Sequence, residues 1–435
     1  MTDAAVKLWG TQVGAVSWDD SRQYGVFQFA PEMVESGIEI APLTMPSRTL
    51  PYSFPALPRD TFKGLPGLLA DSLPDKYGNK LIDTWLARQG RAPNSFNPVE
   101  RLCYIGTRGV GALEFEPATN AATRRAGKVN IGELVDVANQ ILDERGRLKG
   151  KLSGIADDEH AMEDILRVGT SAGGARAKAV LSWNERTGEF RSGQVNTEAD
   201  FEHWLLKFDG VDKNSDKELV DPQGFGRIEF AYHLMATACG IEMSRCRLHL
   251  ENGRAHFMTR RFDRPNGGGK LHMQSLTAMM HYDFNVAGAH SYEQAIQVLR
   301  RLDAENHDIE QQVLRALFNV VGRNQDDHPK NIAYLMDRDG QWRLSPAFDV
   351  AYAYNPSGEW TNRHQMSLNG KRDGFDRTDL ITFGRTAGLK AARVESLLDA
   401  VVDAVERWPD FAAEAGVLDE HVDDVQNGLR HHAVR

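Results

Sequence analysis

The sequence contains few cysteines, and none of them stands in a pattern that binds a metal or forms a disulfide framework. Cys103, Cys239 and Cys246 are scattered, and no two of them form a CxxC pair. Disulfide scaffolds and thiolate metal sites need an even set or closely spaced pairs. We therefore expect three buried thiols that behave as small hydrophobic residues in a reducing compartment.

Long apolar runs and an excess of positive charge are also absent. No apolar run approaches the ~18 residues that a membrane span needs, and the opening segment, MTDAAVKLWGTQVG, lacks the basic and apolar regions of a signal peptide. With 61 acidic and 51 basic side chains, the formal net charge is −10, which disfavours a broad surface for nucleic-acid phosphates. These absences predict a cytoplasmic protein that contacts neither membranes nor, directly, DNA.

The chain has 435 residues, enough for two or three domains with hydrophobic cores of their own. In residues 1–118, short β-prone runs alternate with turn signals at Gly10–Gln12 and Asp19–Ser21, a pattern that predicts a β-meander. Helical spacing follows between Leu65 and Gln89, with Pro74 as the cap of a second helix. A β-rich first domain with several helices is therefore expected.

Residues 119–259 are expected to form a second domain. It begins with a polar linker over 117–129 and a helix over 131–142. Two later strands carry apolar residues at every second position, which places one set on a buried face. The residues of this set are Ala179, Leu181 and Trp183 in the first strand and Trp204, Leu206 and Phe208 in the second.

A helix and a hairpin are predicted to complete the second domain. The helix over 226–241 is amphipathic. Its expected buried stripe is Ile228, Ala231, Leu234, Met235 and Ala238. The hairpin over 245–259 turns at Asn252-Gly253, the strongest short-range hairpin signal.

Residues 260–435 read as a mostly helical third domain. Amphipathic helices are predicted over 291–302 and 309–324. A hairpin should begin at Ile332 and end at Asp349.

Between the second of these helices and the hairpin lies the segment VVGRNQDDHPKNIAYLM. It places Asp326, Asp327, His328, Lys330 and Asn331 within six positions, between apolar flanks. Such a cluster is compatible with a metal site, with a polar turn between a helix and a strand, or with the catalytic loop of a phosphotransferase.

Upstream residues favour the phosphotransferase. Gly169, Gly173 and Gly174, with Ser171, Arg176 and Lys178 nearby, form a loop poor in large side chains, where backbone N–H groups can approach phosphates. Lys207 on the following strand can hold the α- or β-phosphate of ATP, and Glu229 on the next helix could orient that lysine.

The remaining roles follow from the chemistry of phosphoryl transfer. Asp326 would accept or steer the proton of the attacking hydroxyl. Asn331 and Asp349 would hold Mg²⁺ through oxygen ligands. Lys330 would contact the transferring phosphoryl group, and His328 would shape the loop by hydrogen bonding.

Each of these residues also has an ordinary structural interpretation. The glycine loop could be a flexible turn, Lys207 a solvated lysine and Glu229 an exposed helical glutamate. Residues 326–331 could form a polar turn, with Asp349 as a strand-end cap. The order and spacing of all the parts together favour the ATP site.

Several motifs resemble those of the HipA family, the serine/threonine kinase toxins of bacterial toxin–antitoxin pairs. SAGGARAK resembles its phosphate loop, RRFDRP its hinge, DDHPKN its catalytic loop and SPAFDV its magnesium-binding segment. FKGLPGLLADSLPDKYGN and YIGTRGVGALEFEP resemble pieces of its N-terminal subdomain, so the similarity extends from Val6 to about Pro356.

The resemblance implies an α+β, bilobal, protein-kinase-like fold with a β-rich N-terminal subdomain and a mostly helical C-terminal lobe. Asp326 matches the catalytic aspartate, Asn331 and Asp349 the metal ligands, and Lys207 the phosphate-contacting lysine. Ser171 matches a serine whose autophosphorylation silences the kinase. The ATP-binding positions that match the family loop and hinge are Gly173, Gly174, Ala175, Arg176, Ala177, Lys178, Arg260, Arg261 and Phe262. His328 and Lys330 lie in the matched catalytic loop.

Two positions depart from the family pattern. Arg260 stands where some members carry an acidic residue. Asp327 stands where a small residue is usual, and we expect it to be a solvated turn residue.

The resemblance implies a kinase that uses ATP and Mg²⁺ and phosphorylates a serine or threonine of a translation protein, such as an aminoacyl-tRNA synthetase. It also implies a HipB-like helix-turn-helix antitoxin as a partner, through which any DNA contact would run. The alternatives are a small-molecule kinase of the sugar or aminoglycoside type and a metal-dependent hydrolase that uses Asp326, Asp327, His328 and Asp349. A regulatory binding module without catalysis is a further alternative.

Overall fold

The computed structural model describes residues 2–92, 95–119, 128–143, 164–166, 168–169, 176–192, 200–211, 223–265 and 268–435. The chain divides into two compact units. The first consists of Met1–Ile40, Met45–Gln223 and Arg247–Met273, and the second of Ala41–Thr44, Gly224–Cys246 and Gln274–Arg435. The division into three domains stays a prediction, because the first unit contains two separate sheets.

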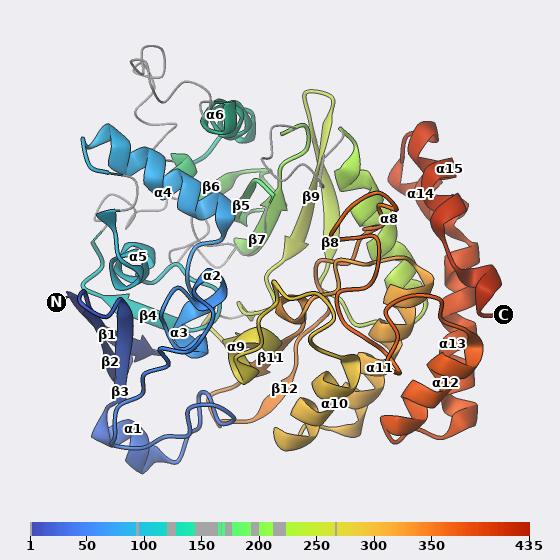
Figure 1. Cartoon of the computed structure of the whole chain (residues 1–435). Helices are drawn as coiled ribbons and strands as arrows, with labels where there is room; N and C mark the ends of the chain where they lie inside the picture. Colours follow the sequence, from blue (N-terminus) through green and yellow to red (C-terminus); the bar gives the residue numbers. More distant parts are fainter. Residues whose placement is uncertain are drawn as a thin grey trace. The chain divides into compact units, whose positions relative to one another are not determined.

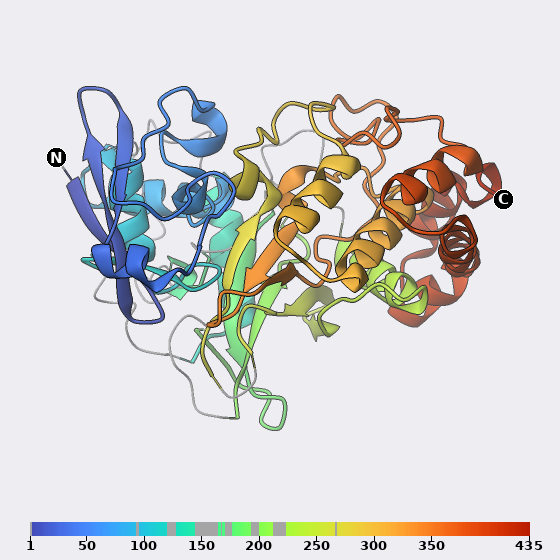
Figure 2. The same ribbon diagram turned by 90° about the horizontal axis from the view of Figure 1, so that it is seen from below.

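The first sheet is the predicted meander with one added strand. Strands β1 (Thr2–Leu8), β2 (Thr11–Asp19) and β3 (Tyr24–Phe29) follow one another, and β4 (Leu113–Glu116) pairs with β1, giving the order β3-β2-β1-β4. The first turn lies at Trp9-Gly10, just before the predicted position, with φ values of 52° and 85°. In Figure 2 these strands are drawn in blue, with β4 in cyan.

The helices of this part are short, and a hydrogen-bonded cap starts each of the two longest. The helices are α1 (Pro31–Ser36), α2 (Arg59–Phe62), α3 (Gly67–Ala70), α4 (Lys76–Arg88) and α5 (Pro98–Ile105). The sequence predicted Pro74 as the cap of α4, and this prediction is wrong. Asp75 is the cap, because its carboxylate accepts the N–H of Gly78 at 2.5 Å, whereas proline has no side-chain acceptor.

The second sheet has five strands in the order β6-β5-β7-β9-β8. They are β5 (Lys178–Trp183), β6 (Phe190–Ser192), β7 (Glu202–Lys207), β8 (Cys246–Glu251) and β9 (Arg254–Arg260). Helices α4 and α6 (Ile131–Asp143) contribute to the same hydrophobic cluster as one face of this sheet, and Figure 1 shows both helices beside β5 and β6.

The predicted buried face of this sheet is confirmed. All six apolar residues predicted for the two strands lie in the cluster that α4 and α6 cover. The β8–β9 hairpin also turns where predicted, with φ values of 46° at Asn252 and 77° at Gly253. Both values are positive, as a two-residue type I′ turn requires.

The second unit is mostly helical, as predicted. Its helices are α8 (Phe225–Ala238), α9 (Leu276–Met280), α10 (Tyr292–Arg301), α11 (Asn306–Val321), α12 (Arg377–Thr386), α13 (Ala391–Glu406), α14 (Trp408–Ala415) and α15 (Asp419–Gly428), with short 3₁₀ turns η4 (Pro329–Asn331) and η5 (His431–Ala433). Helices α10 and α11 lie against each other in both views (Figures 1 and 2).

Most of a small sheet and a long irregular segment also belong to this unit. The sheet has the order β10-β11-β12, formed by β10 (His272–Ser275), β11 (Ala333–Met336) and β12 (Trp342–Leu344). The predicted hairpin is therefore present, but its second strand ends at Leu344, before Asp349. Residues 345–376 then run to α12 without a helix or a named strand.

Helix α8 has the predicted buried stripe at Ile228, Ala231 and Met235 but not at Leu234 and Ala238. It falls within 119–259, but it packs with the helical unit, where Tyr232 lies 5.5 Å from Trp408 and 6.1 Å from Phe318 between ring centroids. Ala238 is exposed and Leu234 only half-buried. Glu229 and Tyr232, which lie outside the predicted stripe, are buried as well.

Two expectations from composition can be compared with the structure. All three cysteines are buried, as predicted. In the part of the chain that the structure describes, no helix is long and apolar enough to cross a membrane.

Candidate active site

The catalytic-loop candidate lies between the end of α11 and the start of β11. Its flanks, Val320, Val321 and Ala333, are fully buried, so both ends of the loop are anchored in the core. Asn331 closes the loop, because its side-chain N–H donates to the backbone oxygen of Asp326 at 2.8 Å. Because the N–H₂ of Asn331 is the donor in this bond, its amide oxygen remains available as an acceptor.

Asp326 is partly open to solvent and is oriented by its neighbours. Its carboxylate is 32% exposed, and one oxygen, Oδ1, accepts the indole N–H of Trp360 at 2.8 Å. The imidazole Nε2 of His328 lies 3.7 Å from the same oxygen. A carboxylate that is both oriented and reachable suits a group that accepts a proton from a substrate.

Asp327 is not the solvated turn residue that the sequence predicted. Its side chain is 1% exposed and accepts hydrogen bonds at 2.7 Å from the hydroxyl of Tyr292, Nδ1 of His364 and the backbone N–H of Gln365. Burial by itself would raise its pKa, but the charge of His364 and these hydrogen bonds outweigh burial and lower the pKa. Asp327 is therefore a buried, hydrogen-bonded anion.

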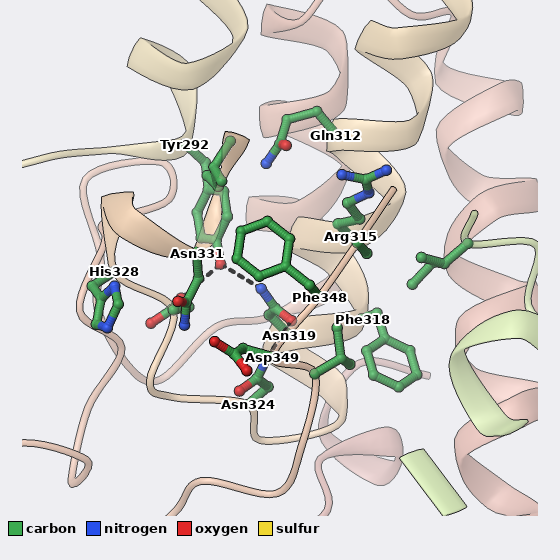
Figure 3. Close-up of a pocket in the computed structure, with 15 residues that line it drawn as sticks. Tyr292, Gln312, Arg315, Phe318, Asn319, Asn324, His328, Asn331, Phe348 and Asp349 are labelled. Carbon is green, nitrogen blue, oxygen red and sulfur yellow. Dashed lines mark hydrogen bonds between the residues drawn. The ribbon is translucent and has the colours of Figure 1, made fainter. Parts of the chain in front are cut away.

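Tyr292 belongs to the same buried network. Burial and the charge of Asp327 raise its pKa well above the ordinary value, so its hydroxyl stays protonated and donates to Asp327. The side-chain amide of Asn319 in turn donates to the Tyr292 oxygen at 2.9 Å (Figure 3).

Asp349 and Asn331 line one pocket of the second unit. The pocket has a volume of about 30 Å³, with room for an ion or a water molecule but not for a nucleotide. Asp349 and Asn324 lie at the opposite end from Gln312 and Arg315 of α11 (Figure 3).

The oxygens at this pocket fit a hard cation. Asp349 offers a carboxylate and Asn331 an amide oxygen, the ligand types that Mg²⁺ takes in proteins. Asp349 has a φ of 52°, a left-handed conformation that is uncommon outside glycine and often marks a functional position. Among the described residues, no group of three or more His, Cys, Asp or Glu side chains is arranged as a metal site.

Lys330 and His328 share an aromatic neighbour that the sequence analysis did not single out. Phe284 lies 5.4 Å from the ammonium of Lys330 and 5.3 Å from the ring of His328, measured to its centroid. The ring of His328 thus packs against Phe284, but its Nδ1 has no hydrogen-bond partner in the described part of the chain, so loop shaping by hydrogen bonding stays a prediction.

In the first unit, two predicted lysines face each other across adjacent strands. Lys207 of β7 is paired in register with Lys178 of β5. The side chain of Lys178 is 2% exposed, and its ammonium lies 3.6 Å from the carboxylate of Asp75. Lys207 is half-buried, with its ammonium 5.7 Å from the ring centroid of Phe257.

Of the remaining residues of the predicted phosphate loop, the structure describes only some. Ser171, Gly173, Gly174 and Ala175 lie outside the described residues. Arg176 is half-buried, whereas Ala177 belongs to the hydrophobic cluster.

Gly169 packs rather than providing open backbone for a ligand. A Cβ atom at this position would lie 2.6 Å from a methyl carbon of Leu81 in α4. The small size of Gly169 is therefore needed for close packing against that helix.

The hinge candidates also have structural partners. Arg261 is buried, and its guanidinium donates to both carboxylate oxygens of Asp263 at 2.9 and 2.7 Å. Arg264 contacts the same carboxylate at 2.7 Å and donates to the backbone oxygens of Gly109 and Gly111. Their charges outweigh the burial of Asp263 and lower its pKa.

This network makes the Arg261 side chain a structural group of the first unit. Arg260 lies 3.3 Å from Glu202, and Phe262 is half-buried. The groups of this segment that remain as candidates for a nucleotide contact are the side chains of Arg260 and Phe262 and the backbone.

Sequence reasoning missed three residues around Asp326 and Asp327. Tyr292 appeared only as part of a helix, and Trp360 and His364 lie in a polar stretch beyond the motifs. The signal that could have found them is the unusual length of the segment between Asp349 and α12, since long irregular segments inside a compact domain are often functional.

Comparison with known proteins identifies the family. The model of the HipA N-terminal domain matches residues 4–116, and that of the HipA-like C-terminal domain matches residues 170–408. The chain therefore belongs to the HipA family.

A solved structure and a curated relative extend this finding. The structure of HipA from Shewanella oneidensis, solved in a complex of HipA, HipB and operator DNA, aligns with a TM-score of 0.66, covers 98% of this chain and 94% of that chain, and is 17% identical. It confirms the predicted α+β, kinase-like fold. The protein named "Putative kinase Y4mE" of Sinorhizobium fredii is 27% identical over 193 residues, which span 40% of this chain and 44% of that relative.

Proposed function

We propose that this chain is an ATP-dependent protein kinase that transfers the γ-phosphoryl group to a serine or threonine hydroxyl. The observation that carries the proposal is the grouping of Asp326, Asn331 and Asp349 in one unit. Asn331 is hydrogen-bonded to Asp326 and lines a small pocket together with Asp349. Membership of the HipA family supports it.

The proposed roles follow from the chemistry of these groups. The substrate oxygen forms a bond to the γ-phosphorus while the bond from that phosphorus to the β–γ bridging oxygen breaks and ADP leaves. Asp326 takes the hydroxyl proton as this happens. Asn331 and Asp349 would hold Mg²⁺, which neutralises charge on the phosphate oxygens when bound.

Positive side chains are proposed to contact the phosphates. Lys330 lies in the catalytic loop, and Lys207 lies on β7. Lys178 is assigned a weaker role, because it is buried and paired with Asp75.

The biological role is proposed from the family. We infer a toxin that phosphorylates a protein of translation, with an aminoacyl-tRNA synthetase as one candidate, and that is restrained by a HipB-like antitoxin. The solved HipA structure contains HipB and operator DNA, which supports an antitoxin partner that supplies the DNA contact. Autophosphorylation at Ser171 is part of this proposal.

The hydrolase alternative is disfavoured. It requires Asp327 as a ligand or base, but this carboxylate is buried and holds three donors.

The test is incubation of the full chain with γ-labelled ATP and magnesium, with and without a bacterial lysate. We expect label on the chain itself or on a lysate protein, and none with Asp326→Ala or Asp349→Ala. Asp339→Ala is the matched control, because Asp339 lies exposed in the turn between β11 and β12. Label found only on small molecules would overturn the protein-kinase assignment in favour of the small-molecule kinase, and unchanged transfer in Asp326→Ala would overturn the site.

A further inference from the structure

We propose that the segment from Trp360 to Gln365 is a positioning element for the catalytic aspartate, held by Asp327 and acting through the indole of Trp360. This inference rests on the proposed function of Asp326. The two neighbouring aspartates of the catalytic loop then have complementary tasks. Asp326 takes the proton, and Asp327 fixes the segment that orients Asp326.

The first step is the attachment of the segment to Asp327. One carboxylate oxygen accepts the backbone N–H of Gln365, and the other accepts Nδ1 of His364 and the hydroxyl of Tyr292, all at 2.7 Å. His364 and Gln365 are 0% and 2% exposed. Because the anion and its donors are buried together, they hold one another in a single geometry.

The second step is a set of backbone hydrogen bonds that hold the end of the segment and the residues after it. The backbone N–H of Gly288 donates to the oxygen of Gln365 at 2.8 Å. Just beyond the segment, the N–H of Ser367 donates to the oxygen of His290, and its oxygen accepts the N–H of Tyr292 at the start of α10, both at 2.9 Å. The segment is therefore fixed on two sides, by Asp327 and by the stretch that leads into α10.

The third step connects this anchor to Trp360. The side-chain N–H₂ of Gln365 donates to the backbone oxygens of Trp360 and of Arg363, the latter at 3.1 Å. Gln365 thus takes part in both contacts: its backbone binds Asp327, and its side chain holds the backbone of Trp360.

The last step reaches the reacting group. The indole N–H of Trp360 donates to Oδ1 of Asp326 at 2.8 Å. With Oδ1 engaged by this donor, the second oxygen, Oδ2, is the one that takes the hydroxyl proton. Trp360 therefore selects which oxygen acts and fixes the carboxylate rotamer, a form of preorganisation that acts on the rate of transfer more than on nucleotide binding.

The test uses three single variants and the double variant Trp360→Phe/Asp327→Asn in the full chain. Trp360→Phe keeps a large ring but removes the N–H, and Asp327→Asn removes the charge that anchors the segment. Trp408→Phe is the matched control, because the Trp408 indole donates a similar bond to the backbone oxygen of Val422 at 3.1 Å, away from the site. Phosphoryl transfer is measured as kcat and as KM for ATP, and amide hydrogen exchange is measured in peptides that cover Gln365 and 322–332.

We expect Trp360→Phe and Asp327→Asn each to lower kcat by about tenfold, the effect of losing one hydrogen bond to a reacting group, with KM for ATP nearly unchanged. The double variant should lose little more than the larger single loss, because both changes act along one path. Asp327→Asn should also speed exchange at Gln365. Trp408→Phe should change neither kcat nor this exchange.

Three results would overturn the inference. The first is an unchanged kcat in Trp360→Phe while Asp326→Ala is inactive. The second is a kcat of the double variant that falls by the product of the two single-variant factors, as expected for independent effects. The third is unchanged exchange at Gln365 in Asp327→Asn. The exchange result does not depend on turnover, so a protein without kinase activity would refute the proposed function while exchange still decides the anchoring by Asp327.

Discussion

At the scale of single residues, Asp326 and Asp327 show how far neighbours in sequence can differ in environment. The Asp326 carboxylate is about one-third exposed, whereas that of Asp327 is almost fully buried. The difference arises because successive side chains of the loop point in different directions, one toward solvent and the other toward Tyr292 and His364. Residue type alone does not reveal this.

The ionisation of Asp327 leads to a pH-dependent prediction. Its folded pKa is lowered, since the charge of His364 and three hydrogen bonds outweigh burial. The anion therefore adds stability above the unfolded pKa of about 3.9, and this contribution is lost as the pH falls through the folded pKa. We expect Asp327→Asn to lower the free energy of unfolding by about 3 kcal/mol at neutral pH and by less in acid.

Urea denaturation at neutral pH and at an acidic pH well below the unfolded pKa, where the chain still folds, measures this difference. Asp339→Asn, at an exposed turn position, serves as the control and should be neutral at both pH values. A loss of the same size at both pH values would show that the charge of Asp327 is not what stabilises the fold.

At the scale of elements, local patterns predicted structure well where a short stretch determines its own geometry. The alternating strands β5 and β7, the Asn252-Gly253 turn and helix α10 lie where they were predicted, whereas α11 begins and ends three residues before its predicted span of 309–324. Helix α8 differed in part: Leu234 and Ala238 are not buried, whereas Tyr232 is covered by Phe318 and Trp408 from helices later in the chain.

The β8–β9 turn gives the prediction at this scale. Gly253 has a φ of 77°, and a Cβ at this position would meet nothing within 4 Å, so only backbone conformation opposes a side chain. We expect Gly253→Ala to lower the free energy of unfolding by about 1 kcal/mol. Asn252→Gly should be close to neutral, since its φ of 46° already favours glycine.

Thermal or urea denaturation of both turn variants checks this expectation. A Gly253→Ala protein as stable as the unmodified chain would mean that the turn relaxes to another type. In that case the positive φ values are not required by the hairpin.

At the scale of the whole molecule, two buried thiols allow the folding of each unit to be measured separately, because one thiol lies in each unit. Burial and the charge of Glu100 raise the pKa of Cys103 to about 11, and burial raises that of Cys239 to about 12. Cys103 lies in the first unit and Cys239 in the second. Since only thiolates react, both should be nearly inert in the folded protein.

Labelling with iodoacetamide near pH 8, followed by peptide mass spectrometry, tests this. We expect Cys103 and Cys239 to react at least about a hundredfold more slowly than a free thiol, and at the free rate in denaturant. Rapid labelling of Cys103 alone in the absence of denaturant would contradict its burial and show that the first unit opens under native conditions.

The sequence by itself determined most of the helices and strands, the α+β class, the family and the candidates Asp326, Asn331 and Asp349, because these depend on local periodicity and on the spacing of short motifs. The tertiary structure alone decided which charges are buried: Asp327, Lys178 and Arg261 are each held by partners distant in sequence or hidden in the core. It also brought Trp360 to Asp326, across 34 positions of the chain. Such contacts come from the packing of whole elements, and no local pattern encodes them.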